Sequence, residues 1–224
     1  EILSATAMVQ LAYPKAPCFY CMIPSVMDPF TGRYTGSAPE DNVLGAAIGD
    51  ISRFYRIPAM IGVNASGDKI PSWQAAVDDS LSTSLGLFAE IDMLAGVGMI
   101  EAGKIFSYEE VVMASEIMSI ARKIKEGIVV NKETLALDVI KDVGVGGNFL
   151  SQKHTRKYMW NLWRPTVIDR KPYNQWERSG KKGAFQKANQ IVKKILREHK
   201  PMPLEENVLT GIRELIEQFN EKIF

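Results

Sequence analysis

The 224-residue sequence has few of the residues that most often build metal centres, with only two cysteines and two histidines. The cysteines, Cys18 and Cys21, form a CxxC pair inside the apolar segment CFYCMI, and no second Cys pair or nearby His supplies further metal ligands. On a strand these two side chains would point to opposite faces. We therefore expect two buried structural thiols, no metal site and a reducing compartment, the cytoplasm.

Long apolar runs and a large net charge are also missing. No apolar stretch approaches the ~18 residues of a membrane span, and no signal peptide is evident, so we expect no membrane contact. A formal net charge of +1 argues against nucleic-acid binding. The charge is uneven, because residues 151–200 hold 14 Lys and Arg against 3 Asp and Glu. This basic segment either docks an acidic partner protein or forms a solvated helical face.

Helix-period and strand-like segments alternate along the first ~165 residues, which indicates an α/β fold. Strands are predicted at Cys18–Ile23, Ala59–Val63 and Asp92–Val97, and helices at 1–12, 41–55, 73–88 and 107–126. Short connections between such segments predict parallel βα units over residues 1–165. A helical C-terminal extension is expected over 166–224, with polar, helix-rich segments at 172–198 and 204–221.

Three predicted helices carry further local signals. We expect an inward apolar stripe on each of two helices: Val43, Ala47, Ile48, Ile51 and Phe54 on one, and Val111, Ala114, Ile117, Met118, Ala121 and Ile124 on the other. Ser107 and Glu110 predict a capping box, in which the Glu110 side chain reaches back to the Ser107 N–H. Another helix is predicted from Asn131 to Gly144.

Polar, glycine-containing loops follow the three predicted strands. We name them the first loop (Ser25–Gly36), the second loop (Asn64–Lys69) and the third loop (Gly96–Gly98). Because the C-terminal ends of parallel strands lie at one edge of a sheet, the three loops should converge on one pocket. The Asp68–Lys69 pair of the second loop either orients a substrate or caps the following helix.

Several aromatic residues lie near these strand ends, and a few other motifs need an assignment. Phe19, Tyr20, Phe30, Tyr34 and Trp73 either pack in the core or offer ring faces to a quaternary ammonium group. The glycines at 144, 146 and 147 follow a helix, so they indicate a helix end and not a dinucleotide fingerprint. We expect structural roles for His154 and His199.

Three segments resemble one enzyme family. They are MDPFTGRYTGSAPE from Met27, NKETLALDVIKDVGVGGNFL from Asn131, and HTRKYMWNLWRPTVIDRKPYNQWERSGKKGA from His154. They are similar, in the same order, to the C-terminal half of the trimethylamine methyltransferase family, and the likeness extends over about residues 9–215. The resemblance implies a (β/α)8 TIM barrel, of which this chain would supply the last three or four βα units.

The same resemblance implies a reaction. A methyl group would pass from a methylated amine, either trimethylamine or a quaternary amine such as glycine betaine, to the Co(I) of a corrinoid. The corrinoid would be carried by a separate cognate protein, so this chain would bind no cofactor directly. We also expect a homo-oligomer.

Candidate site residues follow from the loops and the resemblance together. The candidate catalytic residues are Asn64, Lys69 and Gln74, and the candidate substrate-binding residues are Tyr20, Asp28, Phe30, Tyr34 and Trp73. Family members that act on trimethylamine carry pyrrolysine at a place similar to the end of the strand at 59–64. None is present in this sequence, which favours a quaternary amine.

The second loop departs from the family pattern. The family's DSKxxDxQA reads GDKIPSWQA here, with Gly67 and Ser72 in place of two aspartates. Two alternatives therefore stay open. One is a homologue that binds quaternary ammonium compounds without demethylating them, and the other is a different TIM-barrel enzyme that uses the same face.

Overall fold

The computed structural model describes the backbone of residues 1–223 and the side chains of residues 1–220. The chain divides after Val192 into two compact units. The first unit contains a parallel three-stranded sheet with the order β1-β4-β5, formed by β1 (Tyr20–Met22), β4 (Ala59–Gly62) and β5 (Met93–Ala95). Tyr20 pairs with Ala59 and Met60 pairs with Met93. The predicted α/β character of this part of the chain is confirmed.

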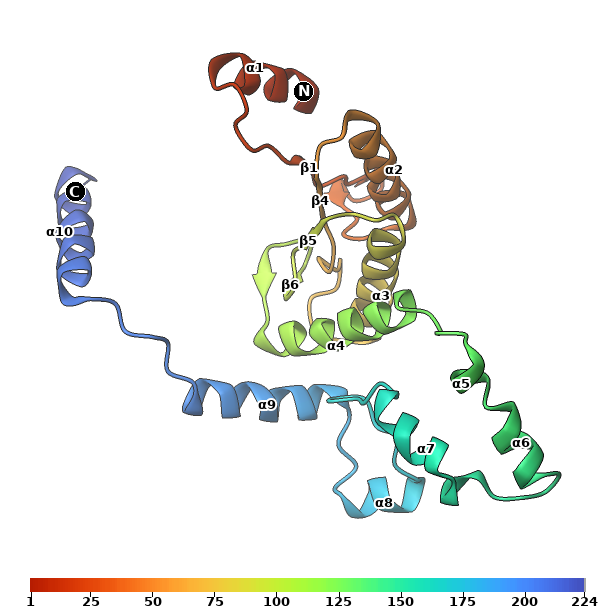
Figure 1. Ribbon diagram of the computed structural model, residues 1–224. Helices are drawn as coiled ribbons and strands as arrows, with labels where there is room; N and C mark the ends of the chain where they lie inside the picture. The colour runs from red at the N-terminus through yellow and green to blue at the C-terminus, as the bar shows by residue number, and fades with distance from the viewer. Residues whose placement is uncertain (224) are drawn as a thin grey trace. The chain divides into compact units, whose positions relative to one another are not determined.

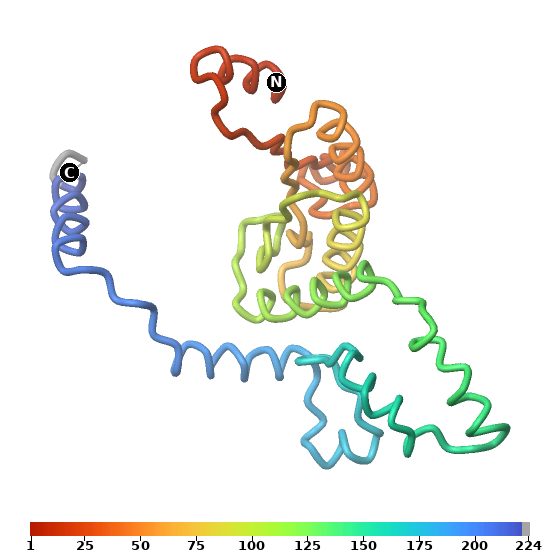
Figure 2. Tube along the Cα trace, viewed as in Figure 1, coloured from red at the N-terminus to blue at the C-terminus, as the bar shows by residue number. Residues whose placement is uncertain are grey.

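Each sheet strand is followed by a helix: α2 (Pro39–Tyr55), α3 (Trp73–Phe88) and α4 (Tyr108–Lys125). Figure 1 shows α2 and α3 along one side of the sheet, and Figure 2 traces the chain through these strand–helix pairs in order. One core cluster forms between sheet and helices, from Tyr20, Ile48, Ala59, Ile61, Val63 and Ile91. Burial of these apolar groups holds the strands in register with the helix layer.

The remaining elements are short. α1 (Ile2–Ala12) precedes the sheet, and two antiparallel hairpins follow sheet strands: β2 (Met27–Asp28) with β3 (Arg33–Tyr34), and β6 (Met99–Ile100) with β7 (Ile105–Phe106). After α4 come α5 (Lys132–Leu135), α6 (Leu137–Val143), α7 (Lys153–Tyr158), α8 (Tyr173–Arg178) and α9 (Ala184–Glu198), with 3-10 turns at Phe149–Ser151 and Met159–Asn161. The second unit contains the end of α9 and α10 (Glu206–Ile223). The expected boundary at residue 165 stays a prediction.

One predicted helix is interrupted. The helix expected from Asn131 to Gly144 is two helices, because Ala136 adopts a left-handed backbone with φ of 50°. A backbone reversal of this kind is not revealed by a helical period in the flanking residues. The helix-rich segment expected over 172–198 contains α8 and α9, which are separated around Gly180, whose φ is 94°.

α2 buries a different face from the one that its apolar residues predicted. Of the predicted stripe only Ile48 is buried, whereas Val43 and Phe54 are 67% and 79% exposed. The buried residues are Asp41, Asn42, Gly45, Ile48, Gly49 and Ser52. A Cβ atom on Gly49 would lie 2.6 Å from the Ala89 carbonyl oxygen, so small residues are what allow this close contact.

α4 also differs from its predicted pattern. Its buried residues are Glu110, Ala114, Glu116 and Ala121, while Ile124 is exposed. Ser107 caps the helix as predicted, because its Oγ accepts a hydrogen bond from the Glu110 N–H at 3.2 Å. The other half of the capping box is wrong: the Ser107 N–H donates to the Gly98 carbonyl at 2.9 Å, and the Glu110 side chain is fully buried.

The expectation that both thiols are buried is wrong. Cys21 is exposed and Cys18 is partly buried, and both are free. Strand alternation places Cys21 on the face of β1 opposite Tyr20, which is the buried residue of that strand. Among the described residues no helix combines the length and the apolarity that crossing a membrane requires.

Candidate functional site

The loops that follow the three sheet strands meet through backbone hydrogen bonds. The Gly67 N–H donates to the Gly36 carbonyl at 3.1 Å, which joins the second loop to the first. The Glu101 N–H, at the tip of the β6–β7 hairpin, donates to the Asp68 carbonyl at 2.6 Å. The expected meeting of the first and second loops is therefore confirmed, whereas the third contributor is the hairpin tip at Glu101 and not the third loop (Gly96–Gly98).

Glycine allows the first two loops to touch. A Cβ atom on Gly67 would lie 2.5 Å from the Thr35 carbonyl oxygen, and one on Gly36 would lie 2.7 Å from the Gly67 nitrogen. Gly36 also has a φ of 66°, which disfavours other residues. Gly67, one of the two departures from the family pattern, thus has a structural role in this chain.

A buried carboxylate holds the first loop in shape. Asp41, near the start of α2, accepts hydrogen bonds from the Val26 N–H at 2.6 Å, the Thr35 hydroxyl at 2.8 Å and the Ala38 N–H at 3.0 Å. Bonds to an ionised acceptor are the stronger kind. Sequence reasoning missed this residue; its signal was an acidic residue three positions after Ala38 at a helix start.

Three adjacent cavities surround Tyr34, whose exposed fraction is 68%. We name them by one lining residue each. The Arg33 cavity measures about 380 Å³, the Asp41 cavity about 470 Å³ and the Asp28 cavity about 490 Å³. Tyr34 lines all three, so the tyrosine is the shared wall of the site.

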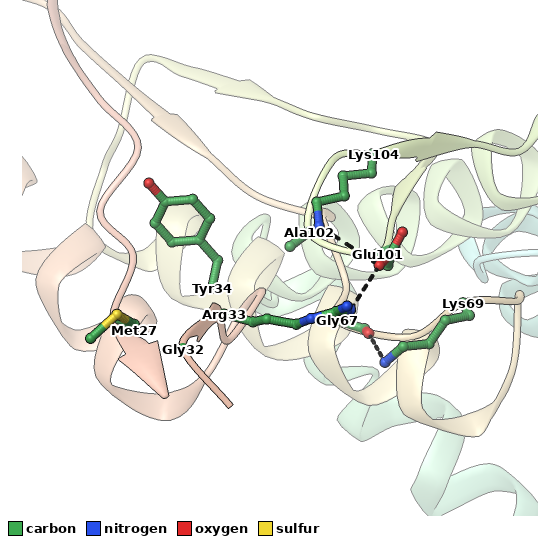
Figure 3. Close-up of a pocket in the computed structure, with 9 residues that line it drawn as sticks. All are labelled: Met27, Gly32, Arg33, Tyr34, Gly67, Lys69, Glu101, Ala102 and Lys104. Atoms are coloured by element: carbon green, nitrogen blue, oxygen red, sulfur yellow. Dashed lines mark hydrogen bonds and ion pairs between the residues drawn. The ribbon is translucent and has the colours of Figure 1, made fainter. Parts of the chain in front are cut away.

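The Arg33 cavity is rich in charge (Figure 3). Its lining residues are Met27, Gly32, Arg33, Tyr34, Gly67, Lys69, Glu101, Ala102 and Lys104. Glu101 Oε1 lies 3.2 Å from Arg33 Nη1 and 3.8 Å from Lys104 Nζ. Lys69 Nζ donates to the Gly67 carbonyl at 2.7 Å. The Arg33 and Tyr34 side chains diverge, as neighbours on a strand do.

Four of the eight candidate residues lie together. Asp28, Tyr34, Lys69 and Gln74 all line the Asp28 cavity. The Asp28 carboxylate accepts hydrogen bonds from the Phe30 N–H at 2.9 Å and from the Thr31 hydroxyl at 2.8 Å. The first and then the second of these donors lower the pKa of Asp28 below its ordinary value. It is therefore a fixed negative group beside Tyr34.

The other four candidates lie away from these cavities. Tyr20 is 8% exposed and belongs to the core cluster. Phe30 and Trp73 are 97% and 81% exposed and line none of the three cavities. Asn64 is fully buried, and its Oδ1 accepts a hydrogen bond from the Thr83 hydroxyl at 2.5 Å. The functional roles of all eight residues stay predictions.

The Asp68–Lys69 pair is used within the second loop. The Lys69 N–H donates to Asp68 Oδ1 at 2.7 Å, and the Ser72 hydroxyl donates to Asp68 Oδ2. The Ser72 hydroxyl, as the main cause, lowers the pKa of Asp68. Ser72 Oγ also accepts the Gln74 N–H at 3.1 Å and so caps α3. The cap of α3 is thus Ser72 and not the Asp68–Lys69 pair, which contacts the cap only through the Ser72 hydroxyl.

Behind the second loop, two carboxyl groups are buried together where α3 and α4 pack. Asp79 and Glu110 are both 0% exposed, and none of their four carboxyl oxygens has a hydrogen-bond partner in the described part of the chain. Burial, and then the neighbouring Glu110, raises the pKa of Asp79 to about 9. Burial likewise raises the pKa of Glu110. Asp79 is therefore held in the protonated form at neutral pH. Sequence reasoning missed the pair because Glu110 fitted a capping box.

Within the described residues, no cluster of three or more His, Cys, Asp or Glu side chains is arranged to hold a metal ion. Arg33, Asp41, Glu101 and Lys104 are the charged cavity residues that the sequence did not single out. Arg33 stood inside the first loop, so its position was a usable signal. Glu101 and Lys104 follow the third loop by only a few residues, and their inclusion needed the hairpin to be known.

Comparison with known proteins matches the whole described chain to one family. A family model described as "Trimethylamine methyltransferase" matches residues 1–223. A trimethylamine methyltransferase of Methanosarcina thermophila is 33% identical over 213 residues, 95% of this chain and 44% of the relative. One of Desulfitobacterium hafniense is 31% identical over 222 residues, 99% of this chain and 45% of the relative.

A second kind of relative is more distant. A glycine betaine methyltransferase of Desulfitobacterium hafniense (strain Y51) is 26% identical over 225 residues, covering 100% of this chain and 47% of that protein. The chain thus spans about half the length of the curated relatives that it matches.

Proposed function

Since the chain belongs to the trimethylamine methyltransferase family, we propose that it is part of an enzyme that transfers a methyl group from a methylated amine. The acceptor in this proposal is the Co(I) centre of a corrinoid carried by a cognate protein. The observation that carries the proposal is the family match over residues 1–223, together with relatives named as trimethylamine and glycine betaine methyltransferases. A cytoplasmic location and a homo-oligomer stay predictions.

We also propose that these βα units form part of a (β/α)8 barrel. The three parallel strands lie in sequential order, and α2 and α3 cover one side of the sheet. A doubly wound sheet would place helices on both faces, whereas a barrel has its helices in one outer layer. The loops after the strands, which build the three cavities, lie where barrel enzymes have their active sites.

The proposed reaction moves one methyl carbon. Its bond to the amine nitrogen breaks, the electron pair stays on nitrogen, and the acceptor supplies the nucleophile that forms the new bond. The protein's task is to hold the amine with one methyl group directed at the acceptor. Tyr34 is placed for this role, because its ring lines all three cavities and a ring face attracts an ammonium group.

The test is consumption of Co(I). We expect the full-length protein, mixed with its Co(I) corrinoid protein and either trimethylamine or glycine betaine, to remove the Co(I) absorption. A Tyr34→Leu variant should lose about tenfold or more in kcat/KM, in line with the loss of a cation–π contact of up to ~2 kcal/mol. Tyr13→Leu is the matched control, since Tyr13 is 72% exposed and lies outside these cavities.

Two outcomes would count against the proposal. Persistence of Co(I) with both amines would contradict methyl transfer. Binding of the amine without loss of Co(I) would instead support the second candidate, a homologue that only binds quaternary ammonium compounds. The observation that motivates this candidate is the second loop, where Gly67 and Ser72 serve the contact between loops and the cap of α3.

A further inference from the structure

The basic part of the chain contains one stretch that is both cationic and aromatic. Residues 153–171, here called the cationic segment, hold six Lys and Arg against one Asp. That acid, Asp169, is already neutralised, because Lys187 Nζ lies 2.6 Å from its carboxylate. Of the six cations only Lys157 forms a salt bridge within the described part of the chain, with Glu133. Most of the positive charge of the cationic segment is therefore available to a partner.

α4 holds the cationic segment in a fixed shape. The buried Glu116 carboxylate accepts hydrogen bonds from the N–H groups of residues 166–168 at 2.7, 2.9 and 2.8 Å. Trp163 Nε1 donates to Ser119 Oγ at 2.9 Å. Three consecutive N–H groups on one carboxylate fix the backbone, since bonds to an ionised acceptor are strong. The alternative of a solvated helical face does not describe this segment, whose α-helix, α7, has only six residues.

Two guanidinium groups lie over indole rings on this support. Arg164 Cζ is 4.3 Å from the ring centre of Trp160, and Arg170 Cζ is 5.0 Å from the ring centre of Trp163. A stacked guanidinium is pre-oriented and keeps N–H donors at its edge for a carboxylate. Trp160 is 65% exposed and Leu162 69% exposed. Exposed Trp and Arg beside an apolar side chain are typical of the energetic centre of a protein interface.

α4 also connects this surface to the candidate site. The helix begins directly after the β6–β7 hairpin, whose tip lines the Arg33 cavity, and Ser107 caps its start. Glu116 lies nine residues after Ser107, which is about 14 Å along the helix axis. A partner that covers the usual area of about 800 Å² spans roughly 30 Å. One partner protein is therefore large enough to contact the cationic segment and the loops after the sheet strands together.

We propose that the surface formed by Trp160, Arg164 and Arg170 docks the carboxylate-rich face of a partner protein. This inference rests on the proposed function, in which that partner is the carrier of the Co(I) corrinoid, and adds the surface that the carrier contacts. The occupant follows from the charge: guanidinium edges bind carboxylates in bidentate pairs, while the indole ring and Leu162 exclude water around them. A nucleic acid fits less well, because the chain as a whole has a formal net charge of only +1.

Binding between the full-length protein and its carrier protein tests the surface without turnover. Arg164→Glu should raise the Kd for the carrier about tenfold or more. Trp160→Leu removes the ring beneath that guanidinium and should also weaken binding, whereas Trp160→Phe keeps a ring face and should retain most of the affinity. The difference between parent and Arg164→Glu should shrink as salt is raised.

Lys193→Glu is the matched control for the charge change. Lys193 is exposed on α9 outside the cationic segment, and the substitution alters the net charge by the same amount as Arg164→Glu. It should leave the Kd nearly unchanged. Urea unfolding of each variant checks the fold, and we expect the parent midpoint for Arg164→Glu, because the residue it replaces is exposed.

Turnover separates docking from chemistry. With the carrier protein as acceptor, Arg164→Glu should raise the KM for the carrier about tenfold and leave kcat at saturating carrier unchanged. With free cob(I)alamin, which has no protein face, the parent and Arg164→Glu should react equally fast.

Four results would overturn the inference: an unchanged Kd in Arg164→Glu, equal weakening by Lys193→Glu, no binding of the carrier, or tighter binding of a DNA duplex than of the carrier through the same residues. The proposed function is decided separately. A protein that consumes Co(I) with the same KM for the carrier in parent and variant keeps the function and loses the docking surface. One that binds the carrier through this surface and consumes no Co(I) keeps the surface and loses the function.

Discussion

The buried pair of Asp79 and Glu110 makes a prediction about pH and stability. An Asp in the unfolded chain loses its proton near 3.8, whereas burial raises the pKa of Asp79 in the folded chain to about 9. Between these values the folded state binds one proton more than the unfolded state. The free energy of unfolding therefore falls as pH rises, and the stabilisation is complete only below the ordinary carboxyl pKa.

The size of the effect follows from the proton count. One extra bound proton gives a slope of about 1.4 kcal/mol per pH unit, or about 4 kcal/mol between about pH 5 and about pH 8. Glu110, whose pKa is also raised by burial, adds to the slope in the same direction. An Asp79→Asn variant keeps the shape of the side chain and removes its titratable proton. The slope of its unfolding free energy against pH should therefore be shallower by about one proton.

Urea unfolding of the full-length protein, followed by circular dichroism at several pH values, measures this slope. Glu126→Gln is the control. Glu126 directly follows α4, the helix that carries Glu110, but its side chain is 62% exposed and pairs with Lys123. It should leave the slope unchanged. An Asp79→Asn variant with the parent slope, or a parent whose stability rises over this pH range, would refute the reasoning.

Three further substitutions have expected outcomes. Gly67→Ala should lower amine affinity at least several-fold and destabilise the protein by roughly 1–3 kcal/mol, because the new Cβ would meet the Thr35 carbonyl. Calorimetric titration and urea unfolding measure the two effects, and unchanged values would contradict the loop contact. Glu116→Ala should lower the free energy of unfolding by about 3 kcal/mol or more, since it removes the buried acceptor of the N–H groups of residues 166–168. A loss under about 1 kcal/mol would show that water replaces the carboxylate. Ser107→Ala should cost about 1 kcal/mol through loss of the α4 cap, and an unchanged unfolding midpoint would argue against that cap.

Local signals predicted the backbone elements of the first unit well. The helix expected at 73–88 has the bounds of α3, because Ser72 caps its start and the apolar period continues to its end. Strands were found at the expected places but shorter, since pairing length depends on the neighbouring strand and not on the strand's own residues.

Predictions about faces were less successful, for a physical reason. α2 was expected to bury its large apolar side chains, yet it packs through glycines and polar residues such as Gly49 and Asp41. Packing depends on the shape of the opposing surface, which the helix sequence does not contain. Asn64 shows the same limit: it lies two residues after the end of β4, but its side chain hydrogen-bonds to Thr83 on α3 and lines none of the three cavities.

In the candidate site, too, some features follow from the sequence and others only from the tertiary structure. The sequence by itself determined the family, the order of the βα units and two of the segments that converge, because motifs, periods and turn residues are local properties of the chain. Only the tertiary structure decided that Tyr34 is the shared wall of three cavities, that Glu101 pairs with Arg33 across 68 positions, and that Asp79 and Glu110 share a buried site. Such contacts arise when distant segments pack, and the free energy that selects them belongs to the packed pair and to neither segment alone.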